Sequence, residues 1–272
     1  MAPARFEFDR TDAEADASVS RGTLPPVTSK ASPRASTRHP ERLASPSVLL
    51  PLTRALAVLD EILWPDWERR NYSFDRERDG TCLARMRNGE GDLWYLVFLP
   101  GGAAVLRGFD HESPMSPYRG DGEEPWPGLW GGIPRSLLPW KNAADIEPGE
   151  VTFVMWRSAR GRWRTGPIGF PPGVDPDGSE WLLDHLDGKP NGYVRHVEAR
   201  LGHPIDRHAV RAVYAGLLDA PTILKLNPKA DAVAVLASAR KMRFPLPKPA
   251  KRARATTRAI ARDKAPRTRA PA

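Results

Sequence analysis

Three ionisable residues follow one another at the end of an apolar stretch. Asp110, His111 and Glu112 come directly after Gly108-Phe109 and lead into the loop Ser113-Pro114. The end of a strand that feeds a loop is a common position for binding and catalytic groups. If the extended conformation continued, the two carboxylates would point to one side and the imidazole to the other. Such a carboxylate pair can bind a divalent cation or act as acid and base, so these three residues are the catalytic candidates.

The same residues also have a structural explanation. Asp110 and Ser113 can accept hydrogen bonds from the free amides of a turn, while His111 or Glu112 bonds the end of a neighbouring strand. We favour this explanation, because the sequence offers no second ligand cluster to complete a metal centre. We therefore expect no metal and no cofactor. Walker, nucleophile-elbow and kinase motifs are also absent from the sequence.

A pair of tryptophans forms a second candidate site. Trp126 and Trp130 lie in a stretch rich in proline and glycine, where exposed rings can stack on a base, a sugar or a partner's side chain. Aromatic residues of this size contribute most when they close a core, and we favour that interpretation. We expect the segment from residue 113 to residue 140 to wrap irregularly on a sheet.

The C-terminal segment is the third candidate, because its charge is strongly positive. Residues 240–272 contain 12 lysines and arginines against one acid, Asp263. Such a segment can neutralise the phosphates of DNA or RNA without reading the base sequence. Compositional drift in a chain rich in alanine, proline and arginine explains the tail equally well. The candidate nucleic-acid contacts are Lys251, Arg252, Arg254, Arg258 and Arg262.

The block from Arg107 to Tyr118, with the sequence GFDHESPMSPY at its centre, resembles a stretch of uncharacterised bacterial proteins of similar size. The later segment from Asp175 to Trp181 shares this resemblance. The resemblance places some of these proteins near toxin systems, where they are encoded as immunity or regulatory partners. The resemblance implies no established activity and transfers no functional residue to this chain.

The elements that position the candidates follow from the spacing of apolar residues. Residues 49–63 repeat at helical spacing, and Pro65 ends the run. Asn88-Gly89 is a strong hairpin turn. The run 93–99 is apolar on both faces, so we expect it at the centre of the sheet. The segments with strand character are 72–74, 81–87, 93–99, 103–109, 151–157 and 162–168, and the last two form a second hairpin.

The last third of the chain is predicted to be helical. The four expected helices begin near Asp177 (with Glu180 at capping-box spacing), Tyr193, Asp206 (with an apolar stripe that reaches Leu217) and Asn227 (running to about Lys241). Strands first and helices afterwards predict an α+β fold. It comprises an antiparallel sheet of about five strands built from hairpins, packed by an N-terminal helix and a C-terminal set of helices.

Composition divides the chain into three parts. We expect a disordered leader over residues 1–47, a single globular domain over 48–243 and a disordered basic tail over 244–272. Val48–Ala239 contains 22 basic and 26 acidic residues, so the fold itself is mildly acidic and nucleic-acid affinity should belong to the tail. A single cysteine, no apolar run of about 18 residues and no signal-peptide core predict a cytoplasmic protein without membrane contact.

The function that fits these observations best is a non-enzymatic binding or regulatory protein. Its α+β domain would recognise a protein partner, and its tail would add nonspecific affinity for DNA or RNA. One alternative is a metal-dependent hydrolase that uses Asp110, His111 and Glu112, and another is an immunity-type protein that binds a toxin. Burial distinguishes the first two functions. Convergence of the three side chains in an open pocket with a further acid or an arginine favours the enzyme, whereas capping of strand ends favours the binding protein.

Overall fold

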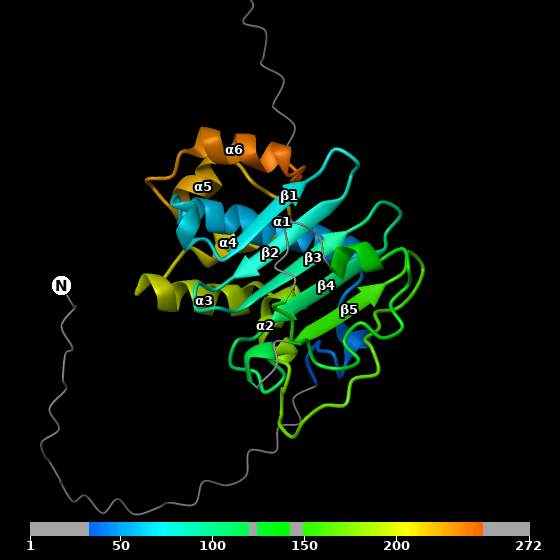
Figure 1. The fold of residues 1–272 in the computed structure, drawn as a ribbon. Coiled ribbons are helices and arrows are strands. Elements are labelled where there is room, and N and C mark those ends of the chain that lie inside the picture. The colour runs from blue at the N-terminus through cyan, green and yellow to red at the C-terminus, as the bar shows by residue number, and fades with distance from the viewer. Residues whose placement is uncertain (1–32, 120–123, 142–148, 247–272) are drawn as a thin grey trace, which may run out of the picture. The chain divides into compact units, whose positions relative to one another are not determined.

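A five-stranded antiparallel sheet, with its strands in the order of the sequence, forms the centre of the fold (Figure 1). The structure is a computed structural model, and it describes residues 33–119, 124–141 and 149–246. The strands are β1 (Tyr72–Arg76), β2 (Cys82–Arg87), β3 (Leu93–Phe98), β4 (Ala104–Phe109) and β5 (Phe153–Arg157). The predicted α+β fold is confirmed, and β3, the strand that is apolar on both faces, is buried at every position in the centre of the sheet.

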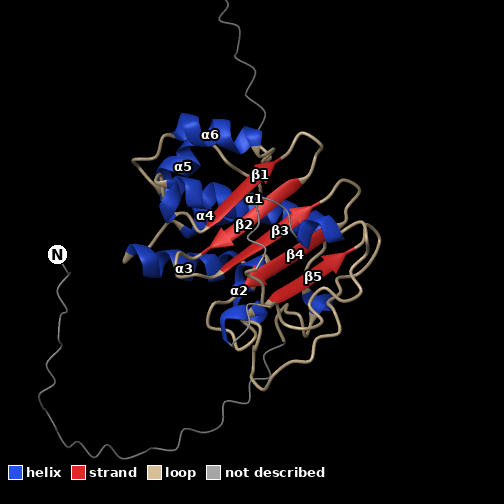
Figure 2. Ribbon diagram, viewed as in Figure 1, coloured by secondary structure: helices blue, strands red, loops and turns tan. Residues whose placement is uncertain are grey.

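Helices cover one face of this sheet (Figure 2). The predicted N-terminal helix is confirmed as α1, and the residues of its expected stripe, such as Leu56 and Leu59, are fully buried. The α1 stripe and all five of the described C-terminal helices share one apolar core with the inner side chains of the strands. Within the described residues, no helix is both long and apolar enough to cross a membrane. The helices are α1 (Pro46–Leu63), α2 (Ser179–Leu182), α3 (Pro190–Leu201), α4 (Arg207–Tyr214), α5 (Ala220–Leu226) and α6 (Ala232–Lys241).

The opposite, outer face of the sheet is covered unevenly. Over β4 and β5, Val105 and Trp156 pack against Leu129 and other residues of the segment that joins these two strands. This agrees with the irregular covering expected for residues 113–140. Over β1 and β2, the outer face instead carries polar side chains, among them the exposed Asp75 and the half-buried Arg85. Two strands therefore present a charged outer face.

The predicted strand over residues 162–168 is not formed. Within the described residues, this segment pairs with β5 only through one isolated antiparallel bridge, between Trp156 and Arg164. The reason lies in the next residues: Pro167 has no N–H to donate to a ladder. Gly166 also lies so close to the Gly128 carbonyl that a Cβ there would be 1.8 Å from the oxygen. The chain therefore leaves the sheet and packs on the irregular segment.

The expected start of the first C-terminal helix is also corrected. The N-cap of α2 is Gly178, with a φ of 73°, and it makes no side-chain capping bond. Asp175 accepts the amides of Glu180 at 2.9 Å and Trp181 at 3.1 Å, so it takes the role that we assigned to Asp177. The cap predicted at Asp206 is confirmed, because its carboxylate accepts the backbone amides of the first turn of α4.

Two further helix predictions were wrong in their boundaries. Asn227 ends α5, an element that the sequence pattern did not indicate, and α6 begins later with Asp231 as its N-cap. An aspartate that accepts two helix amides outcompetes the Asn-Pro start because it satisfies more of the free N–H groups. Leu217 lies beyond the end of α4 and is 60% exposed, so it does not extend the apolar stripe.

The chain before α1 packs earlier than we predicted. The leader was expected to reach residue 47, but Ser36 and Thr37 are buried and Leu43 belongs to the main core. The Thr37 hydroxyl donates to the buried Asp177, and its amide donates to Ser179 Oγ at 3.0 Å. These contacts span about half the chain, so local composition could not indicate them. Residues 1–32 lie outside the described residues, as do 247–272 of the tail, whereas Phe244 is buried.

Candidate functional site

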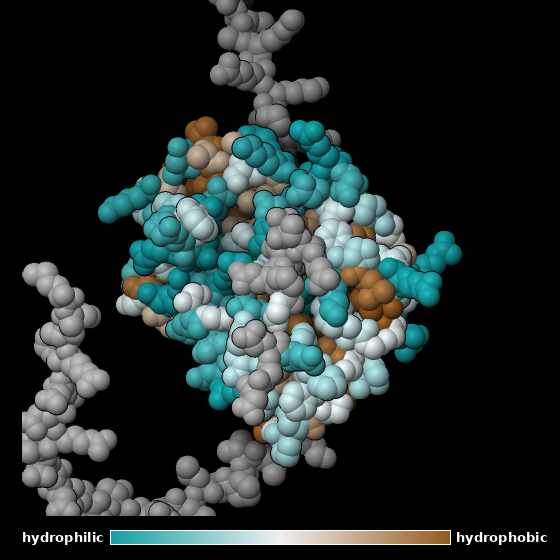
Figure 3. All heavy atoms as spheres, in the orientation of Figure 1, coloured by the Kyte–Doolittle hydropathy of each residue, from teal (hydrophilic) through white to brown (hydrophobic). Residues whose placement is uncertain are grey.

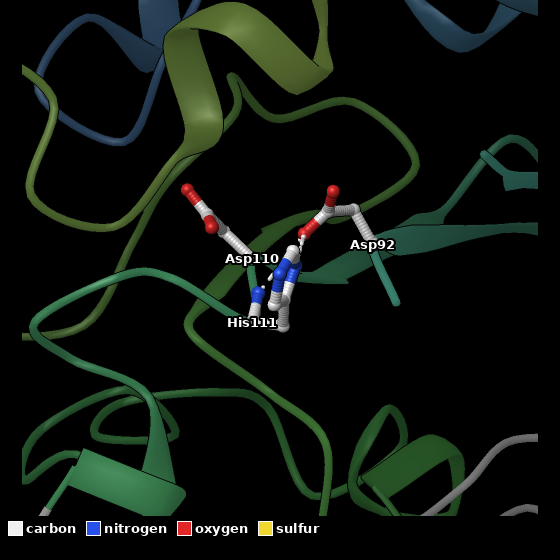
Figure 4. Close-up of side chains that lie close together, drawn as sticks. All are labelled: Asp92, Asp110 and His111. Atoms are coloured by element: carbon white, nitrogen blue, oxygen red, sulfur yellow. Dashed lines mark hydrogen bonds and ion pairs between the residues drawn. The ribbon is translucent and has the colours of Figure 1, made fainter. Parts of the chain in front are cut away.

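The predicted cluster lies where β3 begins and β4 ends. Leu93 pairs with Phe109 across the two strands, so the residues just outside this pair, Asp92 and Asp110, come to the same end of the sheet. Asp92 Oδ1 accepts two hydrogen bonds from His111, one from the backbone amide at 2.9 Å and one from ring Nδ1 at 2.7 Å (Figure 4). Sequence analysis missed Asp92, which precedes its partner by 19 positions.

Asp110 joins three parts of the fold. Its amide donates to Thr152 Oγ1, next to β5, at 3.1 Å. Its carboxylate accepts the amide of Glu112 on Oδ1 and the indole Nε1 of Trp181 on Oδ2, each at 3.0 Å. A Cβ at Gly178 would lie 2.3 Å from Oδ2, so the α2 segment can approach Asp110 only with glycine at this position. Both carboxylate oxygens are engaged in bonds that hold the backbone together.

The strand does not continue through the three candidate residues. A turn begins at Asp110, whose carbonyl accepts the amide of Ser113 at 3.2 Å. Asp110 is buried, whereas His111 and Glu112 are exposed, and in Figure 4 the Asp110 carboxylate points away from the His111 and Asp92 pair. The expected pairing of Asp110 with Glu112 on one side is therefore replaced by a contact between Asp92 and His111.

The cluster opens onto an acidic hollow of about 550 Å³. Asp92, Asp110 and His111 each offer one ligand atom within 4.8 Å of the others, so they are the described residues that could hold a cation. Within the cluster, His111 Nδ1 donates to one oxygen of Asp92, and the side-chain amide of Asn88 donates to the other at 2.6 Å. The bond to Asp92 also raises the pKa of His111, which favours the protonated ring over a metal ligand.

The tryptophans of the second candidate site are half-buried. Trp126 donates its indole N–H to the Gly169 carbonyl at 2.9 Å, and both rings pack against the outer-face core. The guanidinium of Arg107 and the ammonium of Lys141 each lie 5.9 Å from the Trp130 ring. Trp126 and Trp130 thus pack as expected for residues that close a core. A binding role for either residue stays a prediction.

The basic candidates of the tail, Lys251, Arg252, Arg254, Arg258 and Arg262, all lie outside the described residues. The structure therefore adds nothing to the predicted contacts with DNA or RNA.

A buried polar network beneath β1 was not indicated by the sequence. Asp60 of α1 accepts the amides of Asn71 at 2.6 Å and Tyr72 at 2.9 Å, and the Tyr193 hydroxyl at 2.7 Å. Complete burial raises the pKa of Asp60 to about 6 in spite of these bonds. The Tyr72 hydroxyl in turn contacts His185 Nδ1 at 2.6 Å. These groups hold the N-terminal end of β1 onto α1 and α3.

A basic hollow on the outer face of β1 and β2 was also missed. It has a volume of about 600 Å³, and we call it the Trp67 surface. Trp67 stands in the short 3-10 helix Trp67–Arg69 and is 74% exposed, more than any other tryptophan of the described residues. The sequence Trp67-Glu-Arg-Arg70, just after α1, was the available signal. The cations of the Trp67 surface are Arg69, Arg70, Arg85, Arg87 and Arg200.

Comparison of the chain with protein-family models, with curated proteins and with solved structures finds no match. The resemblance of the block from Arg107 to Tyr118 to uncharacterised bacterial proteins therefore stays a prediction.

Proposed function

We propose that this protein is a non-enzymatic binding protein whose α+β domain recognises an acidic protein partner through the Trp67 surface. The observation that carries the proposal is the exposed indole of Trp67 among five arginines. Tryptophan and arginine contribute the largest share of binding energy at protein interfaces, where an aromatic anchor fills a pocket of the partner. A single exposed apolar side chain needs no explanation on its own. Its combination with a basic hollow is what favours binding.

The Trp67 surface is held in place by bonds to the fold. Arg70 donates to the carbonyls of Trp64 at 2.9 Å and Pro65 at 3.0 Å. Arg200 lies 4.5 Å above the Trp64 ring and donates to the Arg69 carbonyl at 2.9 Å. These contacts use Trp64 and leave the ring of Trp67 open to solvent. A preorganised surface loses less conformational entropy when a partner binds.

Charge indicates the chemistry of the partner. Five arginines line the hollow against two acids, Glu68 and Asp75, and the carboxylate of Asp75 is already paired with Arg85. The domain as a whole holds more acids than bases, so this positive field is local. A local basic hollow with an aromatic anchor suits an acidic protein surface, whereas a nucleic-acid backbone needs an extended basic face. Nonspecific binding of DNA or RNA remains our proposal for the tail.

The geometry of the strand-end cluster supports the same conclusion. In a hydrolase the carboxylate of Asp110 would bind a metal or move a proton, whereas here its two oxygens accept hydrogen bonds from the backbone of Glu112 and the indole of Trp181. Asp92 likewise has both oxygens engaged, by His111 and by Asn88. Asp110, His111 and Glu112 also line one open hollow with further acids, which is the arrangement that we expected of the enzyme. We still prefer the binding protein, because the carboxylates of Asp110 and Asp92 are engaged in bonds that tie strand ends together.

Capture of the partner tests this function. We would immobilise the full-length protein, its Trp67→Ser variant and a control variant, Val233→Ser, which removes a side chain that is 79% exposed on α6. A protein from the native host should bind the wild type and the control, elute with salt, and be lost from Trp67→Ser. Equal capture by all three proteins, or capture of nucleic acid alone, would contradict the proposal.

A further inference from the structure

One edge of the sheet is free within the described residues. β1 is the first strand in the order, and it pairs with β2 alone. The Arg87 amide donates to the Asn71 carbonyl, and the Glu77 amide donates to the Thr81 carbonyl, so the odd-numbered residues of this stretch bond toward β2. Because bonded and non-bonded positions alternate in an antiparallel pair, the amides and carbonyls of Phe74 and Arg76 point outward. Such an edge can pair with another extended chain.

A groove runs along this free edge. It has a volume of about 410 Å³ and is bounded by β1 on one side and by the C-terminal end of α6 on the other. Ala57 of α1 lies at its base, and Ser238, Lys241 and Met242 form its far wall. In Figure 1 this end of α6 lies beside β1. A strand facing a helix across a groove is the arrangement in which an extended peptide adds to a sheet.

The groove along the edge of β1, called the β1 groove below, is lined by basic side chains. Arg70, Arg76 and Lys241 line it. Among the described residues, no carboxylate lies within ion-pairing distance of Arg76 or Lys241. The guanidinium of Arg54 lies 5.1 Å from the Phe74 ring at the same place, and burial, together with the charges of Arg243 and Arg76, lowers its pKa. The molecular surface over the β1 hairpin is hydrophilic in Figure 3, so charge and main-chain bonds, not a broad apolar area, would drive binding there.

We propose that an extended, acidic segment of a protein partner binds in the β1 groove as an additional strand on β1. Its main chain bonds the outward groups of Phe74 and Arg76, and its carboxylates face Arg76 and Lys241. Successive side chains of a strand point to opposite faces, so alternate residues would enter the groove or reach the Trp67 surface. The two hollows share Arg70, Ser73 and Asp75, so they adjoin along β1.

This inference rests on the proposed binding function and identifies the chemistry of the partner. The protein's own tail is a poor occupant, because residues 247–272 contain nine basic residues and one acid and share the charge of the groove. A second copy would bring one basic rim against another. An acidic peptide is the occupant that complements both the free edge and its charge.

Proline at position 76 tests the edge directly. Arg76 points its amide away from β2, so Arg76→Pro removes the outward donor without removing a bond of the β1 and β2 ladder. Arg76→Gln is the matched control for the lost charge, and Arg195→Gln on α3 removes an exposed charge elsewhere. A random library of 12-residue peptides displayed on phage would be selected on the full-length protein. The strongest peptide would then be measured against each variant by fluorescence anisotropy.

We expect the selected peptides to be rich in aspartate and glutamate. Arg76→Pro should weaken binding by about 10-fold or more, Arg76→Gln less, and Arg195→Gln not at all, because a lost edge bond costs about 1.4 kcal/mol. Bound peptide should also slow the hydrogen exchange of the Phe74 and Arg76 amides in the wild type. If Arg76→Pro fails to fold, two substitutions of Ser238 in the groove wall replace it as the test. Ser238→Glu should weaken binding of an acidic peptide by repulsion, whereas Ser238→Lys should preserve it.

Three results would overturn the inference. They are a selection in which no peptide binds the wild type better than the Arg76→Pro variant, a selection of basic peptides, and an unchanged rate of hydrogen exchange at the Phe74 and Arg76 amides when peptide is bound. Dimerisation through β1, or tighter peptide binding after removal of residues 247–272, would assign the groove to a second copy or to the tail. A partner that is lost from Trp67→Ser but retained by Arg76→Pro would leave the proposed function intact and remove this inference alone.

Discussion

The indole Nε1 of Trp181 donates a hydrogen bond of 3.0 Å to Oδ2 of Asp110, although the two residues are 71 positions apart in the chain. This bond fixes the α2 segment to the end of β4, while the other oxygen of Asp110 closes the turn at Glu112. Asp110, the first of the three catalytic candidates, thus holds the sheet to the α2 segment. A structural role for Asp110 leads to the first prediction.

Asp110→Ala should lower the free energy of unfolding by about 1 to 2 kcal/mol, because the amide of Glu112 and the half-exposed indole of Trp181 lose their acceptor. Glu112→Ala is the matched control, since its side chain is 79% exposed and the change should stay within about 0.5 kcal/mol. Urea denaturation of both variants measures the difference. Equal stabilities, or a divalent metal that stabilises the wild type and not Asp110→Ala, would argue for a metal site instead.

His111 should titrate above its ordinary pKa, because Asp92 accepts the proton of its Nδ1. The raised pKa means that the protonated ring favours the folded state at low pH and that this contribution disappears as the pH rises through the pKa of the folded protein. Asp92→Asn should move the pKa of His111 downward, and Glu90→Gln in the same hollow should move it less. Proton NMR of the imidazole follows both titrations. An unchanged pKa in Asp92→Asn would show that the contact does not persist in solution.

The buried carboxyl of Asp60 should make stability depend on pH. Its folded pKa of about 6 exceeds the ordinary value of 3.8, so the folded protein keeps a proton that the unfolded chain releases in this range. The group therefore adds stability below about pH 4, and this addition is lost as the pH rises through 6. His185 and His196 have pKa values lowered by burial, which opposes folding in acid, but they are present in wild type and variant alike.

Comparison of wild type with Asp60→Asn isolates the carboxyl. The stability of the wild type relative to the variant should increase by about 2 to 3 kcal/mol as the pH falls from 7 to 4, since the pKa shift is about two units. Denaturation at several pH values measures this difference. A constant difference across the range would contradict the assigned burial of Asp60.

Thr37→Val should destabilise the protein by about 1 to 3 kcal/mol, because Asp177 would lose a hydroxyl donor in a buried position. Thr222→Val, at an exposed cap on α5, should cost less than half as much. Thermal unfolding of the two variants tests whether residues before α1 contribute to the fold. A smaller effect for Thr37→Val than for Thr222→Val would show that they do not.

Local patterns explain which elements could be predicted from the sequence. α1 has a clear helical repeat. Asn88-Gly89 marks a short turn, and two strands joined by a short turn can pair only as antiparallel neighbours. Both parts of the fold were therefore predicted correctly. The predicted strand at 162–168 failed because the close packing of Gly166 on Gly128 involves a segment that is distant in the sequence. The start of α6 failed because two capping residues, Asn227 and Asp231, compete within five positions.

The candidate site depended on contacts that sequence patterns do not encode. Asp110 stood out as an ionisable residue at a strand end, but its partner Trp181 and the neighbouring Asp92 come from other elements. The Trp67 surface and the free edge of β1 follow from the order of strands and from which face the irregular segment covers. Neither property can be derived before the topology is known.

The dissociation constant of the captured partner for wild type and Trp67→Ser tests the central claim most directly. Loss of an aromatic anchor costs about 2 kcal/mol or more, so Trp67→Ser should bind about 30-fold more weakly, whereas Val233→Ser should bind like the wild type. The affinity of the wild type should also fall as salt rises, because acidic groups of the partner face the arginines. Equal dissociation constants for wild type and Trp67→Ser, independent of salt, would contradict the account.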